Sequence, residues 1–230
     1  MLKLIALEIR KNKLASMLKG VLITNLAILA FMILIIFIGQ SEADITFNSY
    51  PEMLDGLSIF VKSSFIIFAA ILLSRLVIDE YKNNTVSLLF MYPIPRKKLM
   101  FAKLIIVFLF TLINIILSNV VLGTLLIGIM QYTNTISGQI TLDLLNTNLI
   151  KTGANAVYAA GISLIPLYVG MRKKSVPATI VTAVFVVSLI SSGSANFQLG
   201  NLVGVSIFLG LLGMFIAYLS IRNVETADID

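Results

Sequence analysis

The residue types in this 230-residue chain that are best suited to specific recognition lie together in one segment, 79–103. The segment begins with acidic residues, ends with basic ones, and holds the apolar core VSLLFMY between them. Asn84–Thr85 supplies side chains that cap helix N-termini. Pro93 stops a helix, because the residue before a proline is pushed out of helical geometry. The pattern predicts a short helix from Thr85 to Tyr92.

The apolar side chains of this short helix need a place to be buried. Leu88, Leu89 and Phe90 are too many large apolar residues for a solvated loop. One interpretation is a helix that rests on lipid headgroups, which would explain the flanking charges. The other is a helix that inserts into a soluble partner, which also explains why the helix has a cap at one end and a stop at the other.

Other kinds of chemistry are excluded by residue types that the chain lacks. It has no cysteine and no histidine, so a thiolate metal site and a histidine base are impossible. It has no GxxxxGK[ST] phosphate loop, so we expect neither enzymatic activity nor a cofactor site in this chain. The net charge of +6 fits cytoplasmic membrane loops better than nucleic-acid binding.

The elements that must position the segment are membrane helices. Hydrophobic residues make up 58% of the chain and charged residues 12%, and the mean hydropathy is +1.00. We therefore expect an all-α integral membrane protein with a single transmembrane domain over residues 1–230. Apolar runs predict six transmembrane helices, at about 20–39, 57–78, 104–129, 152–171, 175–191 and 201–221. Lys62 is expected near the end of the second, where its side chain can reach the interface.

The basic residues predict how these helices are oriented. If both termini are cytoplasmic, 15 of the 17 Lys and Arg residues face the cytoplasm, and Lys62 and Lys151 are the exceptions. The loop 40–56 then lies outside and carries acids without a base. In residues 1–19, apolar residues recur at helical spacing and basic residues fall on the other faces, which predicts an amphipathic interfacial helix. The alternative is a segment that only supplies positive charge on the cytoplasmic side.

Two sets of small or polar residues inside the spans are candidates for a role. Asn25, Asn114 and Asn119 are neutral polar residues deep in predicted spans. They are candidates for a translocation path, although hydrogen bonding between helices is the favoured explanation. Glycines at 200, 204, 210 and 213 allow close helix approach, either between two copies of the chain or within one.

The charged segment and the predicted topology together resemble permeases of the ABC-2 type. The family pattern places a Glu after the second span, then a Gly-Thr pair, a short apolar helix, a Pro and a basic residue. Its counterparts here are Glu80, Asn84–Thr85, Leu89, Pro93 and Arg96. Asn84 replaces the usual glycine, so the match is incomplete at one position.

The resemblance implies that the segment is a coupling helix for a separate ATPase. Such a permease pairs with a second permease copy, identical or related, and with ATP-binding subunits that hold ATP and Mg. Its function would be to export amphipathic molecules such as antimicrobial peptides, drugs or lipids. The coupling residues would be Glu80, Thr85, Leu88, Leu89, Phe90, Pro93 and Arg96.

Size and composition resemble bacitracin or lantibiotic self-protection permeases, which implies the plasma membrane of a bacterium. Two other functions stay open. A secondary transporter would need no ATPase, but it usually keeps an ionisable group in mid-membrane. A non-pumping immunity or scaffold protein could attract cationic peptides to the acidic outer loop, from Glu42 to Asp55.

Overall fold

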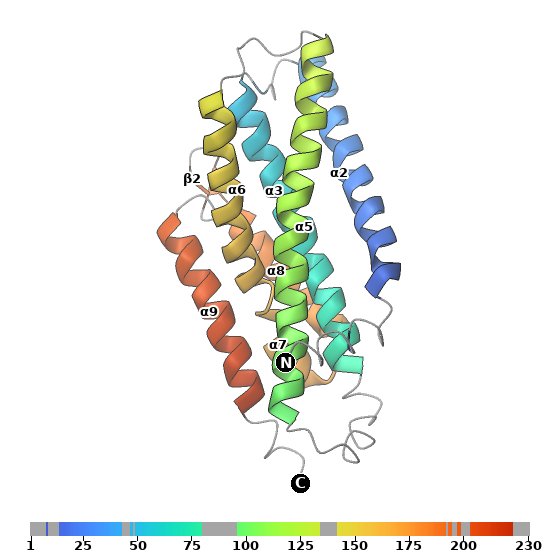
Figure 1. Cartoon of the computed structure of the whole chain (residues 1–230), viewed down its shortest axis with the longest axis vertical. Helices are drawn as coiled ribbons and strands as arrows, with labels where there is room; N and C mark the ends of the chain where they lie inside the picture. Colours follow the sequence, from blue (N-terminus) through green and yellow to red (C-terminus); the bar gives the residue numbers. More distant parts are fainter. Residues whose placement is uncertain are drawn as a thin grey trace. The chain divides into compact units, whose positions relative to one another are not determined.

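Helices make up almost all of the chain that the structure, a computed structural model, describes: residues 8, 14–42, 47, 49–79, 96–133, 142–191, 193–194, 197–198 and 203–222. In chain order these residues form α2 (Leu14–Glu42), α3 (Tyr50–Leu73), the π-helix η1 (Ser74–Ile78), α5 (Arg96–Thr133), α6 (Leu142–Ile162), α7 (Pro166–Lys173), α8 (Val176–Ser191) and α9 (Val203–Arg222) (Figure 1). Between α8 and α9, β1 (Gly193–Ser194) pairs antiparallel with β2 (Phe197–Gln198). The predicted all-α class of membrane protein is confirmed.

Four helical stretches among the described residues are long and apolar enough to cross a membrane. They are Met17–Gly39, Tyr50–Ile78, Lys97–Thr133 and Leu142–Lys173, and they correspond to the first four predicted spans. The fifth and sixth correspond to the shorter apolar helices Val176–Ser191 and Ile207–Ser220. Sixteen residues of α8 extend only about 24 Å, so six membrane crossings stay a prediction.

The chain divides into two compact units, each built from separate stretches of sequence. Unit 1 contains Met1–Leu14, Phe65–Leu112 and Val157–Asp230, and unit 2 contains Ala15–Ser64 and Ile113–Ala156. Within unit 1, Phe68 stacks on Phe110 with ring centroids 5.9 Å apart. Within unit 2, Phe31 meets Phe60 edge to face at 5.2 Å. Aromatic pairs of this kind add to the burial energy of helix packing.

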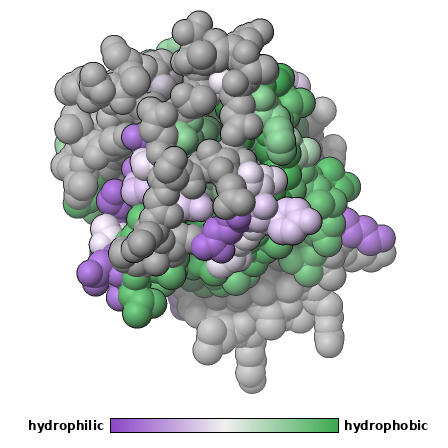
Figure 2. Space-filling view, turned by 90° about the horizontal axis from the view of Figure 1, so that it is seen from above, coloured by the Kyte–Doolittle hydropathy of each residue, from purple (hydrophilic) through white to green (hydrophobic). Residues whose placement is uncertain are grey.

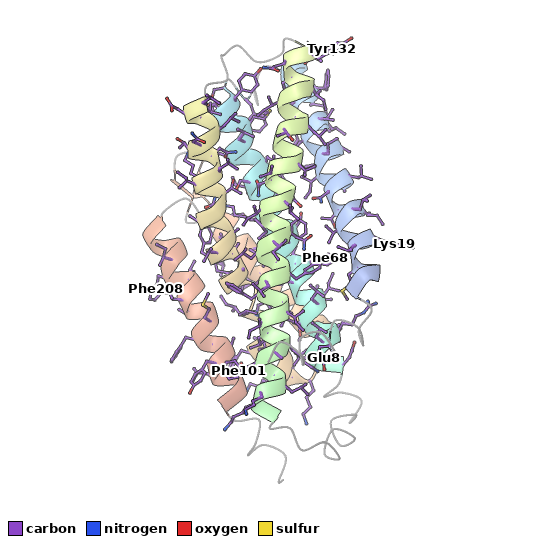
Figure 3. The ribbon with its side chains drawn as sticks, viewed as in Figure 1. Glu8, Lys19, Phe68, Phe101, Tyr132 and Phe208 are labelled. Atoms are coloured by element: carbon purple, nitrogen blue, oxygen red, sulfur yellow. The ribbon has the colours of Figure 1, made fainter. Side chains whose placement is uncertain are left out.

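The outer surfaces of the helices are apolar, as lipid contact requires. Large side chains at Leu22 and Leu26 of α2, Leu117 of α5 and Phe208 of α9 are more than half exposed, and Figure 3 shows Phe208 pointing away from its neighbours. Exposed residues of this kind are unfavourable in water but not in hydrocarbon. Polar residues such as Asn114, Ser118 and Asn119 of α5 lie on buried faces instead.

The helix α2 begins earlier than the apolar run that predicted it. Its first residue is Leu14, so the helix of the first span extends into the range 1–19. Glu8, the one residue described before it, is helical and only 5% exposed. The other residues of 1–13 lie outside the described part of the chain, and an interfacial helix there stays a prediction.

Lys62 lies deeper than the sequence analysis expected. The helix α3 starts at Tyr50, well before the apolar run that begins at Leu57, because Met53 and Leu54 are already buried. Lys62 therefore falls near the centre of the continuous helix 50–78, and it is only 7% exposed. The expectation that Lys62 sits near a span end is wrong.

Close contact between α6 and α9 depends on glycines. A Cβ added at Gly161 would lie 2.6 Å from the carbonyl oxygen of Gly210, and one added at Gly213 would lie 2.8 Å from the carbonyl carbon of Gly161. These distances are too short for any side chain. Of the two alternatives for the glycines of the last span, Gly210 and Gly213 therefore serve packing within one chain.

Helix α7 ends in a left-handed residue that is not glycine. Lys174 has φ 46° and ψ 38°, and its amide donates to the carbonyl oxygens of Gly170 and Met171. Non-glycine residues pay about 1 kcal/mol for this conformation. We therefore expect Lys174→Gly to raise the free energy of unfolding by about 0.5–1 kcal/mol, measured by denaturant titration in detergent. Lys173→Gly, inside the last helical turn, should lower it by about 1 kcal/mol; a loss of stability in both variants would contradict the prediction.

Candidate functional site

The C-terminal end of α3 changes its hydrogen-bond pattern just before the predicted coupling segment. Residues Ser74–Ile78 form the π-helix η1, and the amide of Asp79 donates to the carbonyl oxygen of Ser74. The described chain resumes at Arg96, where α5 begins. A π-helical turn is rare in proteins and occurs frequently at functional sites. The segment 80–95 thus has an unusual helix end before it and a long regular helix after it.

A buried lysine connects these two helices. Lys103 of α5 is 1% exposed, and its Nζ donates a hydrogen bond of 2.7 Å to the carbonyl oxygen of Leu76 in η1. A buried ammonium group is costly unless it is hydrogen-bonded, and a bond from a charged donor is stronger than a neutral one. The contact therefore holds the helix ends on either side of 80–95 together.

The turn between α7 and α8 packs against the same π-helix. Gly170 of α7 lies so close that an added Cβ would be 3.0 Å from Cδ1 of Ile78 and would overlap Oγ1 of Thr179 in α8. Arg172 and Lys173 occupy the last turn of α7, where cations are favoured by the helix dipole. Helices α3, α5, α7 and α8 of unit 1 thus meet at the end that borders the coupling segment.

Most of the predicted coupling residues lie outside the described residues. These are Glu80, Thr85, Leu88, Leu89, Phe90 and Pro93. Arg96 is the first residue of α5. The coupling helix itself stays a prediction, and the structure describes the two ends to which it is connected. Sequence reasoning counted Lys103 only as a cytoplasmic base. Its apolar neighbours Ala102 and Leu104 were the available sign that it is buried.

The three candidate residues of a translocation path all belong to unit 2, where they lie on two helices, α2 and α5. Asn114 and Asn119 lie on the buried face of α5, and Nδ2 of Asn119 donates to the carbonyl oxygen of Ile115 in its own helix. Asn25 of α2 is partly buried, and its Oδ1 has no hydrogen-bond partner. The bond within α5 shows that one donor of Asn119 is used locally.

The comparison with known protein families decides what kind of protein this is. A sequence model of the family described as "ABC-2 family transporter protein" matches residues 4–189, which is most of the chain. The chain belongs to the ABC-2 transporter family. This ABC-2 protein is therefore a multi-pass membrane component of an ABC transporter, a class that works with an ATP-binding subunit and is not itself catalytic.

A full-length relative extends the family assignment but does not identify a substrate. The ABC-2 protein is 39% identical over 227 residues to "Uncharacterized protein YcbO" of Bacillus subtilis (strain 168), with 99% of this chain and 100% of the relative covered. No solved structure matches the chain. Among the described residues of the ABC-2 protein, no group of three potential metal ligands occurs.

Proposed function

We propose that this chain is the permease subunit of an ATP-driven exporter in the plasma membrane of a bacterium, with both termini in the cytoplasm. Membership of the ABC-2 family carries the proposal. The helix ends on either side of 80–95 support it, because a segment that transmits force needs stiff attachments. The buried hydrogen bond between Lys103 and Leu76 provides such an attachment.

The mechanism follows from the chemistry of the coupling segment. Leu88, Leu89 and Phe90 insert into an apolar groove of a separate ATPase, which binds ATP and Mg. Thr85 caps this short helix and Pro93 stops it, while Glu80 and Arg96 brace it from either side. When ATP closes two ATPase subunits, the coupling helices move, and the movement passes into the membrane helices through η1 and the first turns of α5.

The transported molecule and the permease partner belong to the same proposal. A second permease copy, identical or related, completes the transmembrane pathway. The substrate is amphipathic, such as an antimicrobial peptide, a drug or a lipid-like molecule. Asn25, Asn114 and Asn119 are candidates for polar contacts along its path.

One observation favours a second candidate function, an ATP-independent secondary transporter. Lys62 is an ionisable group that is buried near the centre of α3, and ion-coupled carriers keep such groups in mid-membrane. Uphill transport in liposomes that contain an ion gradient but no ATP would support this function against the exporter. A non-pumping immunity protein is distinguished from the exporter by a different test. The protection that it gives the cell would survive a Walker-motif mutation in the partner ATPase.

The exporter is tested with Leu89→Glu and a co-expressed ATPase encoded separately. A carboxylate in an apolar groove is strongly unfavourable, so we expect Leu89→Glu to abolish co-purification of the ATPase and at least 90% of substrate-stimulated ATP hydrolysis, since a penalty of about 1.4 kcal/mol already gives a tenfold loss. The same substitution at Leu149, which is half exposed on α6, should change neither quantity. Unchanged binding and unchanged hydrolysis in Leu89→Glu would rule out the coupling role.

A further inference from the structure

A pocket lies between the first turns of α3 and the first turns of α6, and all of its lining residues belong to unit 2. Its volume is about 370 Å³, and pockets that bind small molecules measure roughly 300–1,000 Å³. Figure 2 looks from above onto the end at which these two helices begin, and it shows hydrophilic side chains gathered among hydrophobic ones. We call this cavity the α3–α6 pocket.

Two contacts between the helices hold the walls of the α3–α6 pocket. Asp55 Oδ2 lies 3.9 Å from Lys151 Nζ, and both side chains are about half exposed. One turn farther along both helices, Asn155 Nδ2 donates a 3.3 Å hydrogen bond to Ser58 Oγ, which belongs to a residue that is only 5% exposed. The pocket is therefore formed before a ligand arrives, and a preformed site loses less entropy on binding.

One wall of the α3–α6 pocket is apolar. Pro51 and Leu54 of α3 and Leu144 of α6 supply it. Leu54 is only 3% exposed, and a Cβ added at Gly123 of α5 would lie 3.3 Å from its side chain. Because α5 supports this wall from behind, the wall can carry the apolar body of a ligand without collapsing into the helix bundle.

The opposite wall, on α6, is polar. Asp143, Thr147 and Lys151 follow one another at intervals of four residues, so their side chains share one face of the helix. Asn148 lies beside Thr147 and also lines the pocket. An apolar wall that faces a few polar groups suits a molecule with an apolar body and a polar end.

The charge of the α3–α6 pocket is negative. Its lining holds two carboxylates, Asp55 and Asp143, and one ammonium group, Lys151. Lys151 is engaged by Asp55, and Asp143 lies eight residues before Lys151, which is about 12 Å along the helix. In the sequence, residues 40–56 and 130–151 contain five acids, and Lys151 is their one base. A field of this sign attracts cations and repels anions.

We propose that the α3–α6 pocket binds an organic cation, a single ammonium or guanidinium group on an apolar body. Asp143 pairs with the cation, and the side-chain oxygens of Thr147 and Asn148 accept its remaining hydrogen bonds. The apolar body lies against Leu54 and Leu144. Lys151 limits the ligand to one positive charge, because it already occupies the second carboxylate. The orientation predicted from the basic residues places this pocket on the outer side of the membrane.

Two simpler explanations of the acids make different predictions. An acid in the first turn of a helix is stabilised by the helix dipole and needs no ligand, in which case Asp143 would not affect binding. A bare calcium ion takes six to eight oxygen ligands, and the described part of the chain brings no three metal-ligating side chains together. As the substrate site of an exporter, the inference rests on the proposed function, whereas cation binding is measured without an ATPase.

The test uses the full-length permease alone in phosphatidylcholine nanodiscs, titrated calorimetrically at constant ionic strength, with empty nanodiscs as the blank. Hexylamine, hexanol and hexanoate are the probes, because they share one apolar chain and differ only in the polar end. We expect saturable binding of hexylamine, about ten-fold tighter than that of hexanol, the effect of one charge-assisted hydrogen bond. Hexanoate should not bind, and calcium ions should not displace hexylamine.

Substitutions at exposed residues assign the binding to the α3–α6 pocket. Asp143→Asn should weaken hexylamine binding about three- to ten-fold, since an ion pair open to water is partly screened. Lys151→Gln should strengthen it by a similar factor, because Asp55 is released. Glu52→Gln is the matched control: it removes the same charge from an exposed position of α3 that does not line the pocket. Its effect should stay below about two-fold.

Several outcomes would overturn the inference. These are no saturable binding of hexylamine, equal binding of hexylamine and hexanol, and tighter binding of hexanoate. Displacement of hexylamine by calcium would identify a metal site instead. Equal effects of Asp143→Asn and Glu52→Gln would mean that the probe senses only the general surface charge. The exporter fails separately, because an ATPase that does not co-purify contradicts the exporter and leaves the cation site intact.

Discussion

Replacing Lys103 by methionine is expected to loosen the two helix ends that flank the coupling segment. Methionine retains most of the volume of the lysine stem but removes the 2.7 Å hydrogen bond to the buried carbonyl of Leu76. A bond from a charged donor contributes about 1.5–3 kcal/mol. We expect the amides of residues 74–79 to exchange hydrogen about 10–100-fold faster, because each 1.4 kcal/mol is a factor of ten. Hydrogen exchange followed by mass spectrometry measures this directly.

Lys98→Met is the matched control for Lys103→Met, because it removes the same charge from an exposed position in the same helix. Its exchange rates at 74–79 should equal those of the wild type, and Lys103→Arg should lie between the two. With the ATPase present, Lys103→Met should retain complex formation but lose substrate-stimulated hydrolysis. If Lys103→Met and Lys98→Met exchanged alike, the buried bond would have no mechanical role.

The sequence predicted the existence of the long helices better than their first residues. The apolar runs of α2 and α5 are visible in hydropathy because lipid contact selects for apolar residues. The hydropathy pattern placed the start of α3 at Leu57 instead of Tyr50, because Glu52 and Asp55 lower the local hydropathy although both lie in regular helix. Likewise, it placed the start of α5 after Arg96, because three bases and the buried Lys103 precede the apolar run although all of them lie in the helix.

The charged residues of the sites were visible in the sequence, but their environments were not. Lys62 appeared as a base near a span end whose side chain could extend toward water, and Lys103 as one of the cytoplasmic bases. Burial of Lys103 depends on Leu76, a residue 27 positions away, and such a contact is set by how helices pack. It was predictable that Asp55, Ser58 and Lys62 share one face of α3 once the helix start is known. The contacts of Asp55 and Ser58 with Lys151 and Asn155 of α6 were not predictable.

The second large effect is expected from a methyl group added to α6. Gly161→Ala adds a Cβ that would lie 2.6 Å from the carbonyl oxygen of Gly210, and the three nearest atoms all belong to the backbone of Gly210. Backbone cannot rotate out of the way as a side chain can, so α6 and α9 must separate. Overpacking costs about 1–3 kcal/mol and occasionally more, and we expect the upper end of this range. Thermal unfolding in detergent should show a fall in Tm of roughly 5–10 °C.

Gly153→Ala is the control on the same helix, because a Cβ there has no atom within 4 Å. Alanine has the higher helix propensity by about 1 kcal/mol, so Gly153→Ala should be neutral or slightly stabilising. The two alanine variants therefore differ mainly in packing, and only Gly161→Ala should lower Tm. Equal Tm values would mean that α6 and α9 do not approach as closely as the structure has them. In that case Gly210 and Gly213 would again be free to contact a second copy of the chain.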